Sequence, residues 1–137
     1  MRTAFFAAKN YLSFKSHAAL VKLQQKNLGS DIMGTKCANE KAAKAMTLAI
    51  SEVYHKDLVQ KMKDMTSPFS VIIDASTDRS QEHVLVVLFQ YLTPEGKIQE
   101  SFYKLVEIKL DESAEGQLLE FQKALEKDDL WDVARER

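Results

Sequence analysis

The spacing of apolar residues changes once along these 137 residues, near Pro68. Upstream of this proline, apolar residues recur at the spacing of one face of a helix. Downstream, short apolar runs rich in β-branched and aromatic residues are separated by turn residues, as in strands. The sequence therefore predicts two domains: a helical region over residues 1–66, and a sheet-containing region over residues 67–137.

Three helices are predicted upstream. The first covers Thr3–Tyr11, and the second begins after Ser13, a good N-cap residue, and ends before Gly29. The third is long and runs from about Ala38 to Met65. Its expected buried stripe consists of Ala42, Met46, Ala49, Val53, Leu58 and Met62.

Three strands are predicted downstream. The run Phe69–Ile73 ends at Asp74, and it is followed by His83–Leu92, which is nearly all apolar and is expected to be covered on both faces. A reverse turn at Thr93–Gly96 joins this strand to a third one, Lys97–Lys109.

A helix that begins at Asp111 or Ser113 and ends near Lys127 completes the order, with Ala114, Leu118, Phe121 and Leu125 in line. The predicted fold class is α+β, with N-terminal helices followed by a three-stranded antiparallel meander and a helix. This is the front half of an RNase H-like fold, although many α+β folds share the order.

Composition narrows the class of protein. Hydrophobic residues make up 45% and charged residues 28%, which is typical of a globular chain. A single cysteine, Cys37, indicates a reduced intracellular protein, and no apolar run is long enough to cross a membrane. Residues 1–66 carry 11 Lys/Arg against 5 Asp/Glu, and residues 67–137 carry 8 against 15. The lysines of the basic half are scattered, so a solvated helix surface is favoured over nucleic-acid binding.

Asp74 is the candidate functional residue. A carboxylate that directly follows an apolar strand is costly to desolvate unless it is paired or binds a cation. At a strand end it would project into a crevice, where metal-binding carboxylates are often found. The alternative is that Asp74 caps the turn that follows it.

Several segments resemble hAT-superfamily transposases and their domesticated relatives. The most specific is Ser67-Pro68-Phe69-Ser70-Val71-Ile72-Ile73-Asp74-Ala75-Ser76-Thr77-Asp78. Similar segments flank it in the family's order: Ala4-Phe5-Phe6, Asn10-Tyr11-Leu12-Ser13-Phe14 and Lys36-Cys37 upstream, and Tyr91 to Ile98 and Leu105-Val106-Glu107 downstream.

This resemblance implies an RNase H-like catalytic core with three acidic residues around two divalent metal ions, Mg²⁺ or Mn²⁺. Asp74 matches the first of the three, Ala75 replaces an acidic residue common in the family, and Asp78 matches an aspartate expected to form the turn. The family's second acidic residue follows a fourth strand that this chain does not contain. Asp128, Asp129 and Asp132 are not expected to replace it.

The resulting expectation is a truncated or degenerate transposase-like protein that is not an enzyme and needs no cofactor. Asp74 would be a relic of a catalytic aspartate in a weak, incomplete metal site, because one carboxylate binds Mg²⁺ poorly. The alternative is a domesticated scaffold module that binds protein or nucleic acid.

Without the fourth strand, the first strand would expose an edge that favours self-association or a protein partner. The resemblance implies a nuclear location. The histidines His17, His55 and His83 lack the spacing of metal ligands, and no local signature supports a Cys37 nucleophile.

Overall fold

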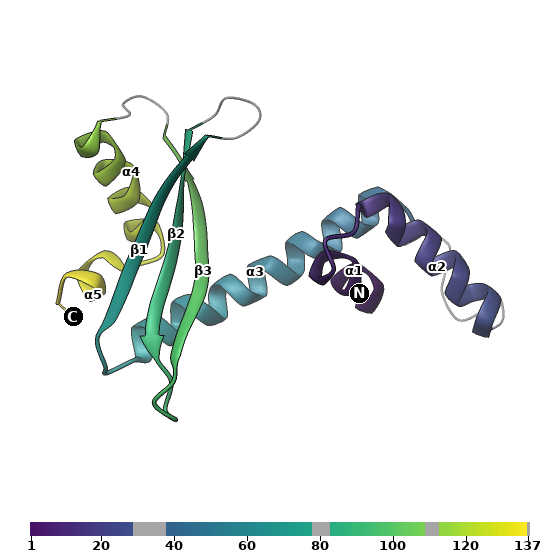
Figure 1. The fold of residues 1–137 in the computed structure, drawn as a ribbon, viewed down its shortest axis with the longest axis horizontal. Helices are drawn as coiled ribbons and strands as arrows, with labels where there is room; N and C mark the ends of the chain where they lie inside the picture. The colour runs from purple at the N-terminus through teal and green to yellow at the C-terminus, as the bar shows by residue number, and fades with distance from the viewer. Residues whose placement is uncertain (29–37, 78–82, 109–112, 137) are drawn as a thin grey trace. The chain divides into compact units, whose positions relative to one another are not determined.

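The computed structural model describes residues 1–28, 38–77, 83–108 and 113–136. The described elements confirm the α+β class: helices are followed by a three-stranded antiparallel sheet and then by further helices (Figure 1). In order they are α1 (Arg2–Lys9), α2 (Phe14–Leu28), α3 (Glu40–Asp64), β1 (Phe69–Thr77), β2 (His83–Leu92), β3 (Ile98–Glu107), α4 (Ala114–Lys127) and α5 (Trp131–Glu136).

The chain forms two compact units, which we call the helical unit (Met1–Tyr54) and the sheet unit (His55–Arg137). The boundary between these units lies inside α3, whereas the change of apolar period predicted a domain boundary after residue 66. None of the described helices is both long and apolar enough to cross a lipid bilayer.

The helical unit is packed through small side chains. Ala4, Ala7 and Ala43 are almost fully buried, together with Val21 of α2. Small residues let helix backbones approach closely, so the fit depends on the absence of larger groups. His17 is also buried here.

The end of α1 is a Schellman motif, in which the chain turns through a left-handed residue. The amide of Leu12 donates to the carbonyl of Ala7 at 2.8 Å, and that of Tyr11 donates to the carbonyl of Ala8 at 3.1 Å. The left-handed residue is Tyr11, with φ of 55°. Glycine is usual at this position because it has no Cβ to clash with the backbone.

The order of strands in the sheet is β1-β2-β3, with both pairs antiparallel. The ladder between β1 and β2 runs without interruption from Phe69 opposite Tyr91 to Thr77 opposite His83. The prediction that β1 ends at Asp74 is therefore wrong. Pairing with β2 continues for three residues beyond the apolar run, so Asp74 lies inside the strand.

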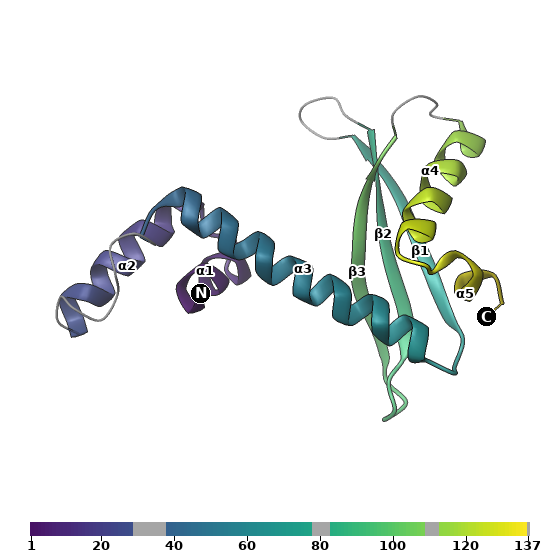
Figure 2. The ribbon, with the colours of Figure 1, turned by 180° about the vertical axis from the view of Figure 1, so that it is seen from behind.

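Burial alternates along β2. Leu85, Val87, Phe89 and Tyr91 are buried on one face, and this face packs with Met62 of α3 and with Phe121 and Leu125 of α4. Within the described residues, the helices of the sheet unit lie on this same face (Figure 2). We call it the core face.

The opposite face, which we call the open face, is less covered. Val84, Val86 and Leu88 of β2 are half-buried there, and on β3 Phe102 is 56% and Leu105 57% exposed. The prediction that β2 is covered on both faces is wrong in the described structure. Its apolar character is explained instead by its central place between two strands.

A β-bulge interrupts β3. Val87 pairs with Lys104 and Leu88 pairs with Phe102, which leaves Tyr103 as the extra residue. A bulge re-aims side chains, and here two consecutive residues, Tyr103 and Lys104, both reach Asp128 at the end of α4.

The hairpin between β2 and β3 forms as predicted. The amide of Gly96 donates to the carbonyl of Thr93 at 2.9 Å, and the φ of Gly96 is 75°, a conformation that favours glycine.

Ser113, one of the two predicted cap residues, caps α4, because its hydroxyl accepts a hydrogen bond from the amide of Gly116 at 3.2 Å. Four residues of the predicted apolar stripes are exposed instead: Ala49, Val53, Ala114 and Leu118. Val53 lies next to the boundary between the two units, and Leu118 lies in the first half of α4, whose buried residues are Phe121 and Leu125.

The end of α4 is a second Schellman motif. The amide of Leu130 donates to the carbonyl of Leu125 at 2.9 Å, and that of Asp129, whose φ is 54°, donates to the carbonyl of Glu126 at 3.0 Å. Leu125 and Leu130 are both fully buried, which supplies the apolar contact that accompanies this motif. The short helix α5 follows, and its Trp131 ring packs edge-on against Phe121 at 6.4 Å.

Candidate functional site

Asp74 is exposed and lies opposite Val86 in the ladder between β1 and β2. Side chains alternate along a strand, so Asp74 shares the open face with Ile72 and Ser76 of β1. The residues opposite these two on β2 are Leu88 and Val84. The immediate sheet neighbours of Asp74 are therefore apolar residues and one hydroxyl, with no second charge among them.

This neighbourhood does not fit the two-metal site that the resemblance implies. Divalent ions held in such a site need several carboxylates that converge from different elements. Asp74 supplies one, and its neighbours in the sheet supply no further carboxylate or imidazole. Asp78 lies outside the described residues, as does Cys37.

The other candidates from the sequence do not converge either. Across the part of the chain that the structure describes, no group of three or more His, Cys, Asp or Glu side chains could hold a metal ion. His17 lies in the helical unit, whereas His55 and His83 lie in the sheet unit on α3 and β2. Asp129 and Asp132 line a pocket of about 280 Å³ with Glu126 and Trp131, but these carboxylates form no such group.

Asp128 is the centre of the densest polar cluster that the structure describes in the sheet unit. Its Oδ2 atom accepts from the Tyr103 hydroxyl at 2.6 Å and lies 2.9 Å from the Lys104 ammonium. The same oxygen lies 3.0 Å from Nε2 of His55. We call these four residues the Asp128 cluster. It joins α3, β3 and the end of α4.

His55 connects the cluster to the backbone of β3. Its Nδ1 atom lies 3.3 Å from the carbonyl oxygen of Tyr103, while Nε2 faces Asp128. A carbonyl and an ionised carboxylate are both acceptors only. The ring makes both hydrogen bonds when each nitrogen carries a proton, which is its cationic form.

The environment shifts the pKa values of two groups in the cluster. Partial burial raises the pKa of Asp128, but hydrogen bonds from Tyr103, Lys104 and His55 outweigh burial, so the net pKa is lowered. Burial, followed by the hydrogen bond to Asp128, raises the pKa of the Tyr103 phenol well above its ordinary value. Both shifts favour an ionised carboxylate that accepts from a neutral phenol.

The hydrogen bonds of the Asp128 cluster have a structural role. All three donors converge on one oxygen of one carboxylate, and the Tyr103 hydroxyl also lies 2.9 Å from the carbonyl of Ala124 in α4. The donors are therefore used within the fold. The cluster fastens the end of α4 to β3 and α3, beside the aromatic contact between Phe89 and Tyr103 at 4.8 Å.

Sequence reasoning missed this cluster because its members lie far apart in the chain. His55 and Asp128 are separated by 73 positions. One local signal was available, since Asp128 occupies the C-cap of α4. A negative charge at a helix C-terminus is unfavourable, so an aspartate there implies nearby cations that compensate for it.

Comparison with protein families gives one match. The model for the ZMYM1/FAM200, RNase-like domain family (DUF4371) matches residues 5–130, which is most of the chain. The chain belongs to this family. It is a family of transposase-derived RNase-like domains, in agreement with the order of helices and strands described above. Neither the curated proteins nor the solved structures gave a match.

Proposed function

We propose that this RNase-like domain is a degenerate module of hAT-transposase descent that has no catalytic activity of its own. The observation that carries the proposal is the neighbourhood of Asp74. Its carboxylate is exposed on the open face, beside Ile72 and opposite Val86, and no other charge adjoins it in the sheet. Phosphodiester chemistry of the implied kind needs two metal ions about 4 Å apart, and one carboxylate cannot hold them.

The hAT descent is supported by the block from Ser67 to Asp78 and by the flanking segments in the family's order. The Mg²⁺ or Mn²⁺ of the complete family domain would have Asp74 as one ligand. We derive no catalytic step from it, because the described residues around Asp74 do not complete the set.

The test is a metal titration combined with a nuclease assay. Wild type, Asp74→Ala and a control, Asp57→Ala, are titrated with Mn²⁺ and observed by NMR, since a bound paramagnetic ion broadens nearby amide signals. Asp57 is an exposed aspartate on α3. We expect the same weak broadening in all three proteins and no cleavage of labelled DNA. Metal-dependent cleavage by wild type that Asp74→Ala abolishes would overturn the proposal.

A second function, a scaffold that associates with a copy of itself, is favoured by the edge of β1. Among the described strands, β1 pairs only with β2. Its nine residues include one charge, Asp74, no proline, and no irregularity in the ladder with β2. Proteins usually protect such edges with charges, prolines or bulges. The other edge, β3, has charges at Glu100 and Lys104 and also has the bulge.

Light scattering after size exclusion tests this second function. An unprotected edge predicts a mass that rises with concentration in wild type. Val71→Pro, which removes an amide donor from β1, is expected to reduce that rise, and Ile98→Pro, which removes an outward-facing amide from the edge of β3, is the comparison. A constant monomer mass for wild type would exclude self-association, and a partner protein would then be sought by capture.

A nuclear location, implied by the resemblance, belongs to the same proposal and is tested by imaging the tagged chain.

A further inference from the structure

The first two helices carry positive charge without any negative charge. Residues 1–30 contain Arg2, Lys9, Lys15, Lys22 and Lys26 and no Asp or Glu. Protein surfaces ordinarily mix both signs, and a surface of one sign attracts partners of the other.

Three of these lysines form a stripe on α2. At about 100° per residue, Lys15, Lys22 and Lys26 lie within roughly 40° of one another around the helix. Their spacing along the axis is about 10 Å and then about 6 Å. All three side chains are exposed. The charges that look scattered in the sequence are therefore aligned in the helix, and we call them the lysine stripe.

The charges of the stripe are not used within the described structure. No ion pair or hydrogen bond joins the ammonium groups of Lys15, Lys22 or Lys26 to another described residue. Lys26 lies in the last turn of α2, where the helix dipole favours a cation. Lys15 lies in the first turn, where the dipole opposes one, so helix stability does not explain its charge.

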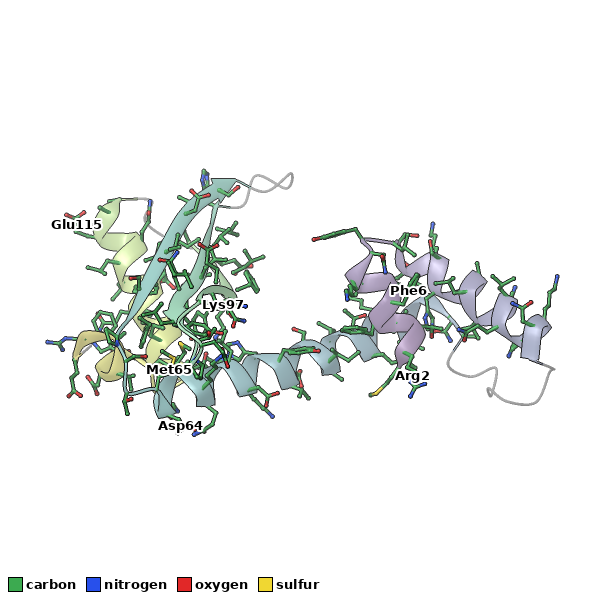
Figure 3. All side chains as sticks on the ribbon, turned by 60° about the horizontal axis from the view of Figure 1, so that its bottom comes forward. Arg2, Phe6, Asp64, Met65, Lys97 and Glu115 are labelled. Carbon is green, nitrogen blue, oxygen red and sulfur yellow. The ribbon has the colours of Figure 1, made fainter. Side chains whose placement is uncertain are left out.

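We propose that the lysine stripe binds the phosphate backbone of nucleic acid. An array of aligned ammonium groups on a rigid helix matches closely spaced phosphates and recognises charge, not base sequence. On α1, Arg2 and Lys9 are also exposed and lie on one side of their helix, and Figure 3 shows Arg2 directed away from α1. They add two further exposed cations to the two N-terminal helices, which contain no acidic residue.

A membrane surface is the less suitable polyanion. A basic helix that binds lipid must insert an apolar face into the interface. On α2 the residues of that face, including His17 and Val21, are buried inside the helical unit. The lysine stripe lies in the helical unit, so nucleic-acid binding there is independent of whether Asp74 binds a metal ion.

The experiment is fluorescence anisotropy of a labelled 20-base-pair DNA with the full chain over a series of NaCl concentrations. The first variant replaces Lys15, Lys22 and Lys26 with glutamine. The matched control replaces three exposed lysines of the sheet unit, Lys56, Lys97 and Lys127, with glutamine. A third variant replaces the stripe lysines with arginine, which keeps the charge. Glutamine, arginine and lysine have similar helix propensities, and far-UV circular dichroism checks that α2 persists.

We expect the stripe variant to bind at least about tenfold more weakly at low salt, with a salt slope smaller by about 2 to 3, because each phosphate contact contributes roughly 0.9 to that slope. The control and the arginine variant should stay within about twofold of wild type. Equal losses in the stripe variant and the control would overturn the proposal. So would no binding of DNA by wild type at 50 mM NaCl, or a lysine-dependent preference for anionic vesicles over DNA.

Discussion

The helical unit and the sheet unit are stabilised by opposite kinds of packing. In the helical unit, Ala4, Ala7 and Ala43 are buried beside Val21 and His17, and the small alanine side chains let the helices approach closely. In the sheet unit, large aliphatic and aromatic side chains fill the core, and Phe89 is fully buried between Phe69 and Tyr103. The first unit is therefore sensitive to added volume and the second to lost volume.

The two units also differ in how they treat charge. The helical unit carries 8 Lys/Arg against 3 Asp/Glu, and its lysine stripe faces solvent. The sheet unit has the opposite excess, with 11 against 17, yet it places the Lys104 ammonium and the His55 ring around one half-buried carboxylate. In the sheet unit charge contributes to the fold, whereas in the helical unit it is available to a partner.

The largest effect is expected from Phe89→Ala, which should destabilise the sheet unit by about 3–5 kcal/mol because it leaves a cavity among packed rings. Urea unfolding followed by the fluorescence of Trp131, the single tryptophan, reports on this unit. The control is Phe102→Ala on the open face, where a loss below about 0.5 kcal/mol is expected. Equal losses in the two variants would show that the core face is not the main source of stability.

The complementary change in the helical unit is Ala7→Leu. The added side chain has no room where the helices meet, so a loss of about 1–3 kcal/mol is expected. It should appear in far-UV circular dichroism while the transition followed by Trp131 is unchanged. Ala8→Leu, at an exposed neighbouring position, provides the control. A shift of both transitions by Ala7→Leu would mean that the two units unfold together.

Removal of the central charge of the Asp128 cluster by Asp128→Asn should cost about 1–3 kcal/mol at neutral pH, because Tyr103 and Lys104 then donate to a neutral amide oxygen and no longer to an ionised carboxylate. The folded protein lowers the pKa of Asp128, so its contribution is full above the unfolded pKa and is lost as pH falls through the folded one. The difference between wild type and variant should therefore shrink below about pH 4. A difference that stays constant down to pH 2 would show that the charge of Asp128 is not its source.

The smallest effects are expected at the two Schellman motifs, one in each unit. Tyr11→Gly should stabilise the helical unit by up to about 1 kcal/mol, because it removes the clash of a left-handed side chain. Asp129→Gly should gain less, since aspartate tolerates this conformation better and its contact with Lys63 at 3.4 Å is lost. Thermal unfolding measures both. A larger gain at Asp129 than at Tyr11 would contradict the argument from side-chain type.

The sequence predicted those structural features that depend on residues close together in the chain. The change of apolar period placed the helices and strands, and the Ser113 cap was predicted because its partner, Gly116, lies three residues away. The end of β1 was missed, since it is set by pairing with His83 across the sheet. The Asp128 cluster was missed for the same reason, because its contacts join positions 24 to 73 residues apart. Asp74 was predicted at a strand end but lies inside β1, and its exposure depends on which face the helices cover.

The bulge in β3 has a consequence for how this chain tolerates changes in length. One residue of β3 has no partner on β2, so the strand holds a spare position between Phe102 and Lys104. Loss of one residue there would regularise the ladder and leave Ser101 and Val106 opposite the same partners. An inserted residue cannot be compensated in this way, and it would move the side chains on one side of the insertion to the opposite face of the sheet. The ladder of β3 should therefore survive the deletion of one residue better than an insertion, although the deletion removes the Tyr103 ring from the core and from the Asp128 cluster.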